Sequence, residues 1–298
     1  MSIKTSFSIK DLESLSGIKA HTIRIWEKRY DILKPERSDT NIRSYSHDSL
    51  KKILNVALLN EKGIKISKIS KMEDQEIFQQ VRELTLTDTS YRHAINSLKL
   101  SMLNFDERLF HDTFNQLLAV HSFREIFLDI FLTFMHEIGY LWLSEVITAA
   151  HEHFISSLIK QKLLVNIERA QSLPVSSDTT FVLYLPSNEL HDLGLLYIHL
   201  ELLLKGHRSI FLGPSVPIDS LLDLQKIYSK ITFISYFTVE PQKDEVMDYL
   251  KEMESTILSG TNNTLHLLGN NAPDQKLINK ENPAIHAYTN IVDLIENM

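Results

Sequence analysis

The sequence has 298 residues and no cysteine, which excludes disulfide bonds, thiolate nucleophiles and thiolate-ligated zinc sites. It also lacks long apolar runs. None approaches the roughly 18 residues of a membrane-spanning helix, and residues 1–10 lack the apolar core of a secretory signal. Apolar residues still make up 43% of the chain, enough for one or more full cores. We therefore expect a folded cytoplasmic protein of two or three domains, without a membrane partner.

Acidic residues outnumber basic ones, and the resulting net charge of −7 by itself argues against a nucleic-acid partner. The average hides an uneven distribution. Residues 1–72 contain 15 Lys and Arg against 8 Asp and Glu, so this segment carries +7 and the remainder −14. A small cationic module on an acidic body suits binding to a phosphate backbone, where each contacted phosphate releases a counterion. A basic surface without a partner is the simpler alternative.

The hydrophobic pattern divides the rest of the chain into two blocks. Residues 73–171 contain one glycine, Gly139, and no proline, and their apolar residues recur at helical spacing, which predicts a helical bundle. After Pro174 and a polar linker at Ser176, Ser177 and Asp178, short β-rich runs alternate with helical stretches. The runs are residues 180–185, 209–212, 231–235, 264–268 and 284–288, with helices expected at 193–205, 220–230, 243–255 and 290–297. This alternation predicts an α/β domain with a Rossmann-like (flavodoxin-like) parallel sheet, which binds ligands beyond the carboxyl ends of its strands.

The N-terminal block has the pattern of a helix-turn-helix. Residues 8–11 form a capping-box sequence ahead of a short apolar helix, and a turn at Gly17 leads to a second helix that opens near Lys19. On that second helix apolar residues share an inner arc, which leaves Arg24 and Lys28 to face outward. In a helix-turn-helix the second helix lies in the major groove of DNA. A solvated basic helix face is the alternative.

Residues 26–45 resemble the recognition helix and wing of the MerR family of transcriptional regulators. The resemblance covers about the first 70 residues and rests on three segments: Thr22-Ile-Arg24-x-Trp-Glu27, Leu33-x-Pro-x-Arg37, and Arg43-x-Tyr45 ahead of a helix capped by Ser46. It implies a winged helix-turn-helix, all-α with a small wing. It also implies that Thr22, Arg24 and Tyr30 approach phosphates or bases and that Arg37, Asn41 and Arg43 grip the neighbouring backbone. Arginine supplies forked donors suited to phosphate, and wing contacts position more than they specify.

Two further expectations concern the same domain. Many relatives have glycine in the wing, where this chain has Asn41-Ile42. Asparagine tolerates positive φ, so the turn is expected to survive. Trp26 and Tyr45 are expected to be core residues rather than base-stacking ones.

In the third block, the loop after the first expected strand carries Glu189 and His191. A histidine binds a metal through one ring nitrogen, and a carboxylate two residues earlier can hold the opposite N–H, which fixes the tautomer and raises the basicity. A loop histidine with an ordinary hydrogen bond is the alternative.

The segment Glu189-x-His191-x-x-Gly194 resembles the Asp/Glu-x-His-x-x-Gly motif of cobalamin-binding domains, in which the histidine replaces the cofactor's own lower ligand on cobalt. The resemblance continues in register over residues 180–298. Residues 213–217 match the loop after the second strand. Ser235-Tyr-Phe-Thr238 lies where the family has a serine that completes the carboxylate–histidine relay and lines the nucleotide tail.

The loop after the fourth strand, Leu268-Gly269-Asn270, lies where the family usually has paired glycines. Asn270 in place of the second glycine implies a narrower tail pocket. The resemblance as a whole implies one set of cobalamin-binding residues in this domain, with His191 as the lower ligand of cobalt. These residues are Glu189, His191, Gly194, Ser235, Thr238 and Gly269.

In the helical block, Trp142 is followed after nine residues by Glu152-His153, which resembles the helical cap of light-responsive, adenosylcobalamin-binding MerR-type repressors. In that family the tryptophan packs against the upper-face adenosyl group and the Glu-His pair contacts it. The resemblance implies that Trp142, Glu152 and His153 bind the cofactor and that the cofactor is adenosylcobalamin. The alternative is that Trp142 belongs to the bundle core and His153 is an ordinary surface residue.

One position departs from those relatives. They have a histidine directly after this tryptophan, proposed to ligate cobalt once light has cleaved the cobalt–carbon bond, and this chain has Leu143. This leaves light as an input open, with His151 as a substitute ligand. A zinc site at residues 151–153 is excluded because position 155 is Ile, whereas a helical two-histidine site has its second histidine four residues after the first. The remaining histidines, such as His199, His207 and His266, are expected to be surface or packing residues.

These observations predict a multidomain transcriptional regulator, a repressor by its resemblance and not an enzyme. Residues 1–72 bind double-stranded promoter DNA, residues 73–174 form a helical bundle cap, and residues 175–298 form a cobalamin-binding α/β domain. Cobalamin gates the assembly of the chain with itself, as a dimer or tetramer, and thereby its DNA affinity, because paired half-sites call for at least a dimer.

Two alternatives stay open. One is a corrinoid carrier or a component of a cobalamin-dependent enzyme, which the fused DNA reader and the lack of a barrel-sized catalytic segment argue against. The other is a regulator whose sensor no longer binds cobalamin, which Leu143 and Asn270 suggest.

Overall fold

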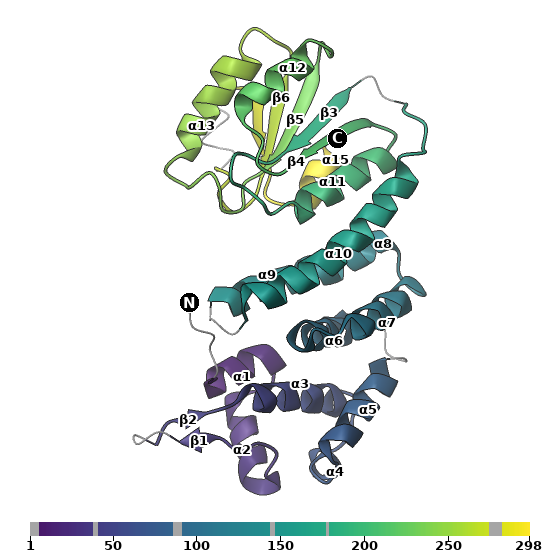
Figure 1. Cartoon of the computed structure of the whole chain (residues 1–298), viewed down its shortest axis with the longest axis vertical. Coiled ribbons are helices and arrows are strands. Elements are labelled where there is room, and N and C mark those ends of the chain that lie inside the picture. The colour runs from purple at the N-terminus through teal and green to yellow at the C-terminus, as the bar shows by residue number, and fades with distance from the viewer. Residues whose placement is uncertain (1–5, 38–40, 86–90, 144–146, 177–178, 274–281) are drawn as a thin grey trace. The chain divides into compact units, whose positions relative to one another are not determined.

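The computed structural model describes residues 6–37, 41–85, 91–143, 147–176, 179–273 and 282–298 (Figure 1). The chain divides into two compact units, Met1–Ile159 and Lys160–Met298, and helix α10 (Ala149–Ala170) contributes to both. The first two predicted blocks fall largely within the first unit, so their separation into two domains stays a prediction. The predicted linker residues Ser177 and Asp178 lie outside the described residues.

The first unit is helical apart from one short β-hairpin. Its elements before α10 are α1 (Ile9–Ser16), α2 (Ala20–Tyr30), β1 (Glu36–Arg37), β2 (Arg43–Ser44), α3 (His47–Glu61), α4 (Ile66–Ile69), α5 (Asp74–Thr85), α6 (Tyr91–Asn104), α7 (Glu107–Leu118), α8 (Phe123–Glu125), the π-helical segment η1 (Ile126–Phe131) and α9 (Leu132–Leu143).

Local sequence signals determine where α1, the first helix of the helix-turn-helix, begins and ends. The Ser8 hydroxyl accepts from the Asp11 amide at 3.2 Å, and the Asp11 carboxylate accepts from the Ser8 amide at 2.6 Å, which confirms the predicted capping box. Gly17 then ends α1 with φ at 71°, a left-handed conformation that glycine adopts without strain. The turn directs the chain into α2.

Helix α6 is the centre of the first unit. Its residues from His93 to Leu103 are all buried, and it contacts α3 and α5 as well as α7, η1 and α9. A helix buried on every side belongs in the middle of a helical domain rather than on its surface. Buried phenylalanines complete the core around it: Phe110, Phe114, Phe127, Phe131 and Phe134.

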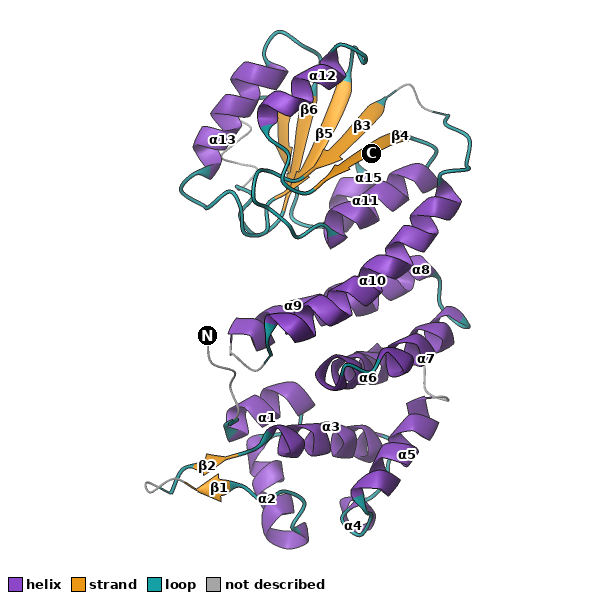
Figure 2. Ribbon diagram, in the orientation of Figure 1, coloured by secondary structure: helices purple, strands orange, loops and turns teal. Residues whose placement is uncertain are grey.

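The second unit is built on a five-stranded parallel sheet (Figure 2). After α10 its elements are β3 (Thr180–Tyr184), α11 (Leu193–Leu204), β4 (Arg208–Gly213), the 3-10 segment η2 (Ile218–Leu221), α12 (Leu222–Gln225), β5 (Ile231–Tyr236), α13 (Val246–Met253), the π-helical segment η3 (Glu254–Leu258), β6 (Thr264–Leu268), β7 (Ile285–Ala287) and α15 (Ile291–Glu296). The strand order is β4-β3-β5-β6-β7, the flavodoxin-like order, as predicted.

Helices cover both faces of this sheet. Helix α11 packs on β3, β4 and β5 and contacts α15 on the same face, while α13, η2 and η3 pack on the other face against Val182, Phe233 and Leu265 (Figure 2). Strand β3 is fully buried, as expected of a central strand in a doubly covered parallel sheet.

The predicted helix at 220–230 is shorter than expected. The helical segment runs through η2 and α12 and ends at Gln225, whose side-chain amide donates to the Ile257 carbonyl at 2.8 Å. This contact ties the end of α12 to η3, and the chain then turns to enter β5.

Candidate functional site

The recognition helix α2 separates an apolar face from a basic one. Ile23 and Trp26 are buried, which confirms the predicted core role of Trp26, whereas Arg24 is exposed. Tyr30 is half-buried, and the guanidinium carbon of Arg29 lies 5.7 Å from its ring centroid. The helix therefore presents Arg24 to solvent on the side away from the core, as a groove-reading helix requires.

The wing is anchored to α2 by a buried carboxylate. Glu27 accepts a hydrogen bond from the hydroxyl of Tyr45 at 3.2 Å and forms an ion pair of 3.4 Å with Nε of Arg43. Burial and the neighbouring Glu27 charge raise the pKa of Tyr45 to about 12, so its hydroxyl remains a donor. Arg43, predicted as a DNA contact, is thus also a structural link between wing and helix, and sequence reasoning did not identify Glu27 as its partner.

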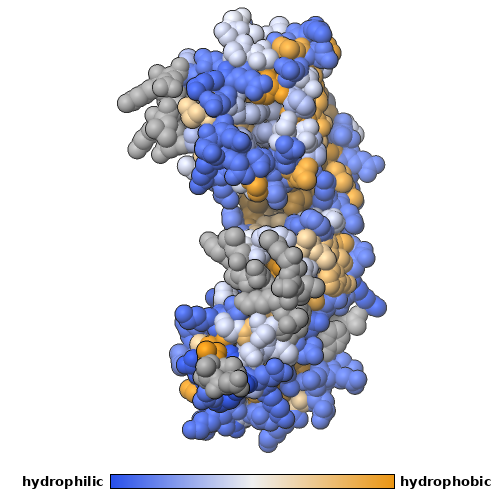
Figure 3. All heavy atoms as spheres, turned by 60° about the vertical axis from the view of Figure 1, so that its left-hand side comes forward, coloured by the Kyte–Doolittle hydropathy of each residue, from blue (hydrophilic) through white to orange (hydrophobic). Residues whose placement is uncertain are grey.

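The wing gathers positive charge at its tip. Arg37 and Arg43 are directly opposite in the β1–β2 hairpin, an arrangement that repels unless counter-charges are present. Glu27 neutralises Arg43, and the exposed Arg37 donates to the Asn41 side chain at 2.6 Å. Asn41 has φ at 61°, so the prediction that asparagine supplies the positive φ of this turn is confirmed. On the face drawn in Figure 3, the lower end of the view, which belongs to the first unit, is largely hydrophilic.

In the second unit, the loops after β3 and β5 meet at the carboxyl end of the sheet, where the strand order reverses. Glu189, from the first loop, is 1% exposed. Its Oε1 atom accepts from the amides of Leu190 and His191 and contacts Nδ1 of His191 at 2.5 Å. Its Oε2 atom accepts from the amides of Thr238, Val239 and Glu240 at 2.7 to 3.1 Å.

This hydrogen bonding sets the charge of Glu189. Burial opposes its ionisation, but the hydrogen bonds from the His191 ring and from the Val239, Glu240 and His191 amides outweigh burial and lower its pKa to about 2. The ionised carboxylate then holds the proton of His191 on Nδ1. The His191 side chain is 56% exposed, so the imidazole is fixed from within and accessible from outside. The predicted contact between the two side chains is confirmed.

The predicted relay through Ser235 is wrong. Its hydroxyl is fully buried and forms no hydrogen bond with Glu189. Because side chains alternate along a strand, Ser235 points to the same sheet face as Phe233, towards α13, whereas Glu189 is held beyond the strand end. The backbone amides of residues 238–240, including that of Thr238, donate to Glu189 in place of the serine hydroxyl.

Close packing explains why glycine occupies both positions, Gly194 and Gly269, that were predicted to belong to the site. A Cβ at Gly269, whose φ is 109°, would lie 2.2 Å from the carbonyl oxygen of Phe237, so only glycine lets the loop after β6 approach the loop after β5. A Cβ at Gly194 would lie 2.9 Å from the ring of Tyr236. Gly194 therefore accommodates a tyrosine ring of this chain at the start of α11.

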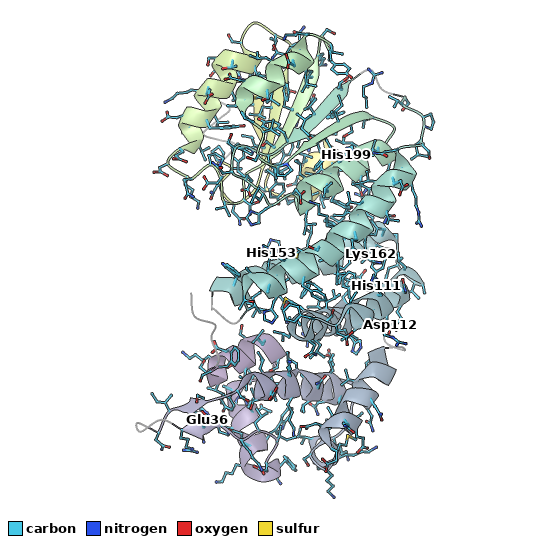
Figure 4. All side chains as sticks on the ribbon, in the orientation of Figure 1. Glu36, His111, Asp112, His153, Lys162 and His199 are labelled. Carbon is cyan, nitrogen blue, oxygen red and sulfur yellow. The ribbon has the colours of Figure 1, made fainter. Side chains whose placement is uncertain are left out.

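In the first unit, Trp142 lies in the last turn of α9, and Glu152 lies in the first turn of α10 with His153 directly after it. Trp142 is 44% exposed, so the alternative that it belongs to the bundle core is wrong. An exposed tryptophan is more informative than a buried one, because it leaves a large apolar surface in water. Glu152 holds Nδ1 of His153 at 2.6 Å, and the His153 side chain is 76% exposed on α10 (Figure 4).

His151 lies in the first turn of α10 and contacts the residue just before the helix. Its Nδ1 atom lies 2.9 Å from the Thr148 hydroxyl, and its ring stacks on Phe105 with centroids 4.6 Å apart. His199 lies on helix α11 rather than on the His191 loop (Figure 4), and it is buried, in agreement with a packing role. Among the described residues, no three or more carboxylate and histidine side chains form a group able to hold a metal ion by themselves.

Comparisons with known proteins match two segments of the chain to established families. Residues 7–76 match the family model of the MerR HTH family regulatory proteins, and residues 94–165 match that of a B12 binding domain. The chain combines a MerR-type helix-turn-helix with a B12-binding domain. Its N-terminal segment is therefore similar to DNA-binding regulators of the MerR type, as the sequence predicted. The B12-binding match covers the helices that carry Trp142, Glu152 and His153.

Two repressors are similar to the chain over most of its length. The chain is 26% identical over 222 residues to the HTH-type transcriptional repressor CarH of Myxococcus xanthus, covering 72% of this chain and 73% of CarH. It is 26% identical over 215 residues to the repressor CarA of the same organism, covering 72% and 70%. A monomethylamine corrinoid protein of Methanosarcina barkeri shares the fold, with a TM-score of 0.57 at 12% identity over 70% of this chain and 100% of that one.

The donor set around His191 fits the lower face of a corrinoid. A metal-binding imidazole is typically oriented by a carboxylate on its other nitrogen, and Glu189 supplies that contact. The helices covering the sheet leave the imidazole more than half exposed. Beside Gly194, in contrast, the Tyr236 ring already fills the space that the glycine leaves.

Proposed function

We propose that this chain is a transcriptional repressor whose assembly and DNA affinity are gated by bound adenosylcobalamin, with His191 as the lower ligand of cobalt. The contact between Nδ1 of His191 and the buried carboxylate of Glu189 carries the proposal. When bound, cobalamin would supply a cobalt ion for His191 to ligate and, in the adenosyl form, a light-labile cobalt–carbon bond.

The residues of this chain orient the imidazole before any ligand arrives. Glu189 keeps the ring proton on Nδ1, so the basic lone pair lies on Nε2, the nitrogen directed away from the carboxylate. The amides of residues 238–240 fix Glu189 in turn. Such outer contacts raise ligand basicity and reduce the ordering cost of binding.

We assign the upper face of the cofactor to Trp142, Glu152 and His153. The exposed indole offers a flat apolar surface, and the Glu152–His153 pair offers polar contacts. The match of residues 94–165 to a B12 binding domain supports this assignment. Gly194, Ser235, Thr238 and Gly269 remain proposed contacts of the same cofactor.

On the DNA side, we propose that Thr22, Arg24 and Tyr30 of α2 enter or flank the major groove, and that Arg37, Asn41 and Arg43 of the wing contact the adjacent backbone. The charge of +7 on residues 1–72 supports this assignment. The role of repressor follows the two relatives, both named transcriptional repressors.

Gating requires that the cofactor bind one state of the protein better than another, because a ligand indifferent to both shifts nothing. We propose that this state is an assembly of the chain with itself, a dimer or tetramer. A corrinoid carrier is the alternative that the shared fold of the Methanosarcina barkeri protein favours, and transfer of a methyl group from bound methylcobalamin would support it. A sensor that has lost cobalamin is the alternative favoured by the Tyr236 ring beside Gly194.

Electron paramagnetic resonance of bound cob(II)alamin tests the lower ligand. A ligand nitrogen of natural abundance splits each cobalt line into a triplet, whereas nitrogen-15 splits it into a doublet. In protein labelled with nitrogen-15 histidine we expect doublets, because the axial nitrogen comes from His191, and His191→Ala should abolish them. Triplets in labelled wild-type protein would show the cofactor's own base on cobalt and would reject the proposal.

A further inference from the structure

We propose that Lys160 is a positioning residue for His191, an inference that rests on the proposed function. Lys160 lies on α10, and its Nζ atom is 2.5 Å from Oδ2 of Asp192, the residue directly after His191. The Asp192 side chain is 9% exposed and that of Lys160 is 41% exposed. Both residues belong to the second unit.

The role of Asp192 differs from what its position in the sequence predicts. Aspartate at the N-cap of a helix normally accepts from an amide of the first turn. Asp192 is the N-cap of α11, yet its side chain makes no capping hydrogen bond and turns to Lys160 instead. Its carbonyl accepts the first hydrogen bond of α11, from the Leu196 amide at 2.8 Å. Asp192 is therefore bonded to His191 in the chain, begins α11 through its carbonyl, and contacts α10 through its side chain.

Each end of the His191 loop has its own anchor. On the β3 side, the loop after β4 holds it, because the Ser215 hydroxyl accepts from the Asn188 amide at 3.1 Å and the Ser215 amide donates to the Glu189 carbonyl at 3.2 Å. The Glu189 carboxylate ties the middle of the loop to residues 238–240. At the α11 end, Lys160 is the anchor that comes from a helix preceding the sheet in the chain.

The ion pair should therefore matter more for geometry than for stability. A partly buried ion pair contributes little net stability, but removing one partner leaves a buried charge without compensation. The ion pair fixes the position of the backbone at residues 191 and 192, and this backbone carries the His191 imidazole. Ligands to a metal tolerate little displacement, and loss of outer contacts typically weakens binding by about 10-fold or more.

The experiment compares four variants with wild type. Lys160→Met removes the cation, Lys160→Arg keeps it, and the double variant K160M/D192N removes both charges, so that no buried carboxylate is left alone. Lys226→Met is the matched control, because Lys226 forms an ion pair of 2.6 Å with Asp223 in the same unit, with both side chains exposed. The readouts are cob(II)alamin affinity, the nitrogen-15 doublet, and hydrogen exchange of the Leu190 and His191 amides without cofactor.

We expect Lys160→Met and K160M/D192N to bind cob(II)alamin about 10-fold more weakly, to lose part of the doublet to triplets, and to exchange the two amides faster. Lys160→Arg should restore all three readouts, and Lys226→Met should change none. A full doublet and wild-type affinity in the double variant would overturn the proposal, because the effect of Lys160→Met would then come only from a stranded carboxylate. Triplets in wild-type protein would instead reject the proposed function itself, while the exchange rates would still report whether Lys160 anchors the loop.

Discussion

His199 is a buried histidine on α11 whose Nδ1 atom lies 2.7 Å from the Ser209 hydroxyl. Burial lowers the pKa of its imidazole from 6.5 to about 4. The unfolded chain therefore binds a proton at a higher pH than the folded one. The free energy of unfolding is unaffected by this residue above pH 6.5 and falls as the pH is lowered from 6.5 towards about 4.

Replacing His199 by Asn should remove that dependence. Over this window we expect the wild type to lose about 2 to 3 kcal/mol more unfolding free energy than His199→Asn does. Urea denaturation followed by circular dichroism at several pH values measures the difference. His136→Asn, at an exposed position, is the control, and equal pH profiles for wild type and His199→Asn would contradict the burial argument.

Residue spacing predicted part of the candidate site and missed the rest for a physical reason. The Glu189–His191 contact followed from two side chains two residues apart on a strand-end loop. The partners of the other Glu189 oxygen are backbone amides, which every residue but proline carries, so no residue type marks them. The resemblance to cobalamin-binding domains placed Ser235 in the relay, but a position in a motif does not show which face of the strand a side chain occupies.

At the scale of elements, a buried lysine joins three helices of the first unit. Lys99 on α6 contacts Glu137 on α9 at 2.5 Å and donates to the Leu15 carbonyl, near the end of α1, at 3.3 Å. The Lys99 side chain is 7% exposed and that of Glu137 is 39% exposed. Removing Glu137 and removing Lys99 therefore have different consequences. The Glu137 carboxylate is able to reach water when Lys99 is removed, whereas the Lys99 ammonium stays buried when Glu137 is removed.

We expect Glu137→Ala to destabilise the first unit by about 3 kcal/mol, since it leaves the Lys99 charge buried without its partner. Lys99→Met should cost less than about 1 kcal/mol, because methionine fills similar space and Glu137 turns to solvent. Urea unfolding monitored by tryptophan fluorescence reports this unit, since Trp26 and Trp142 both lie in it. Equal losses, or a larger loss for Lys99→Met, would contradict this asymmetry.

The boundaries and turns of the elements were predictable where neighbouring residues determine them and not where a contact with a distant residue does. The capping box at Ser8, the Gly17 turn and the positive φ of Asn41 depend on a few neighbouring residues, and sequence predicted all three. The early end of α12 depends on a contact between Gln225 and the Ile257 carbonyl, 32 residues away. The Asp192 side chain at the N-cap of α11 likewise depends on a distant residue, because it contacts Lys160, 32 residues earlier, and not an amide of the first turn.

At the scale of the whole molecule, one chain combines a cationic segment that matches the MerR HTH family with an acidic remainder that contains the match to a B12 binding domain. None of the described helices has both the length and the apolar character that crossing a bilayer demands. Coupling between two binding sites is reciprocal, so a cofactor that strengthens DNA binding is itself bound more tightly by the DNA complex. Likewise, a cofactor that weakens DNA binding is itself bound more weakly by the DNA complex.

The ratio of DNA affinities with and without adenosylcobalamin measures whether the cofactor gates DNA binding. A fluorescent duplex chosen by selection from random sequence is titrated in the dark at one fixed salt concentration, because phosphate contacts make affinity depend on salt. We predict a ratio of about fivefold or more for the wild type and no difference for His191→Ala at the same cofactor concentration. An unchanged affinity in wild-type protein that has demonstrably bound the cofactor would contradict gating of DNA binding by cobalamin.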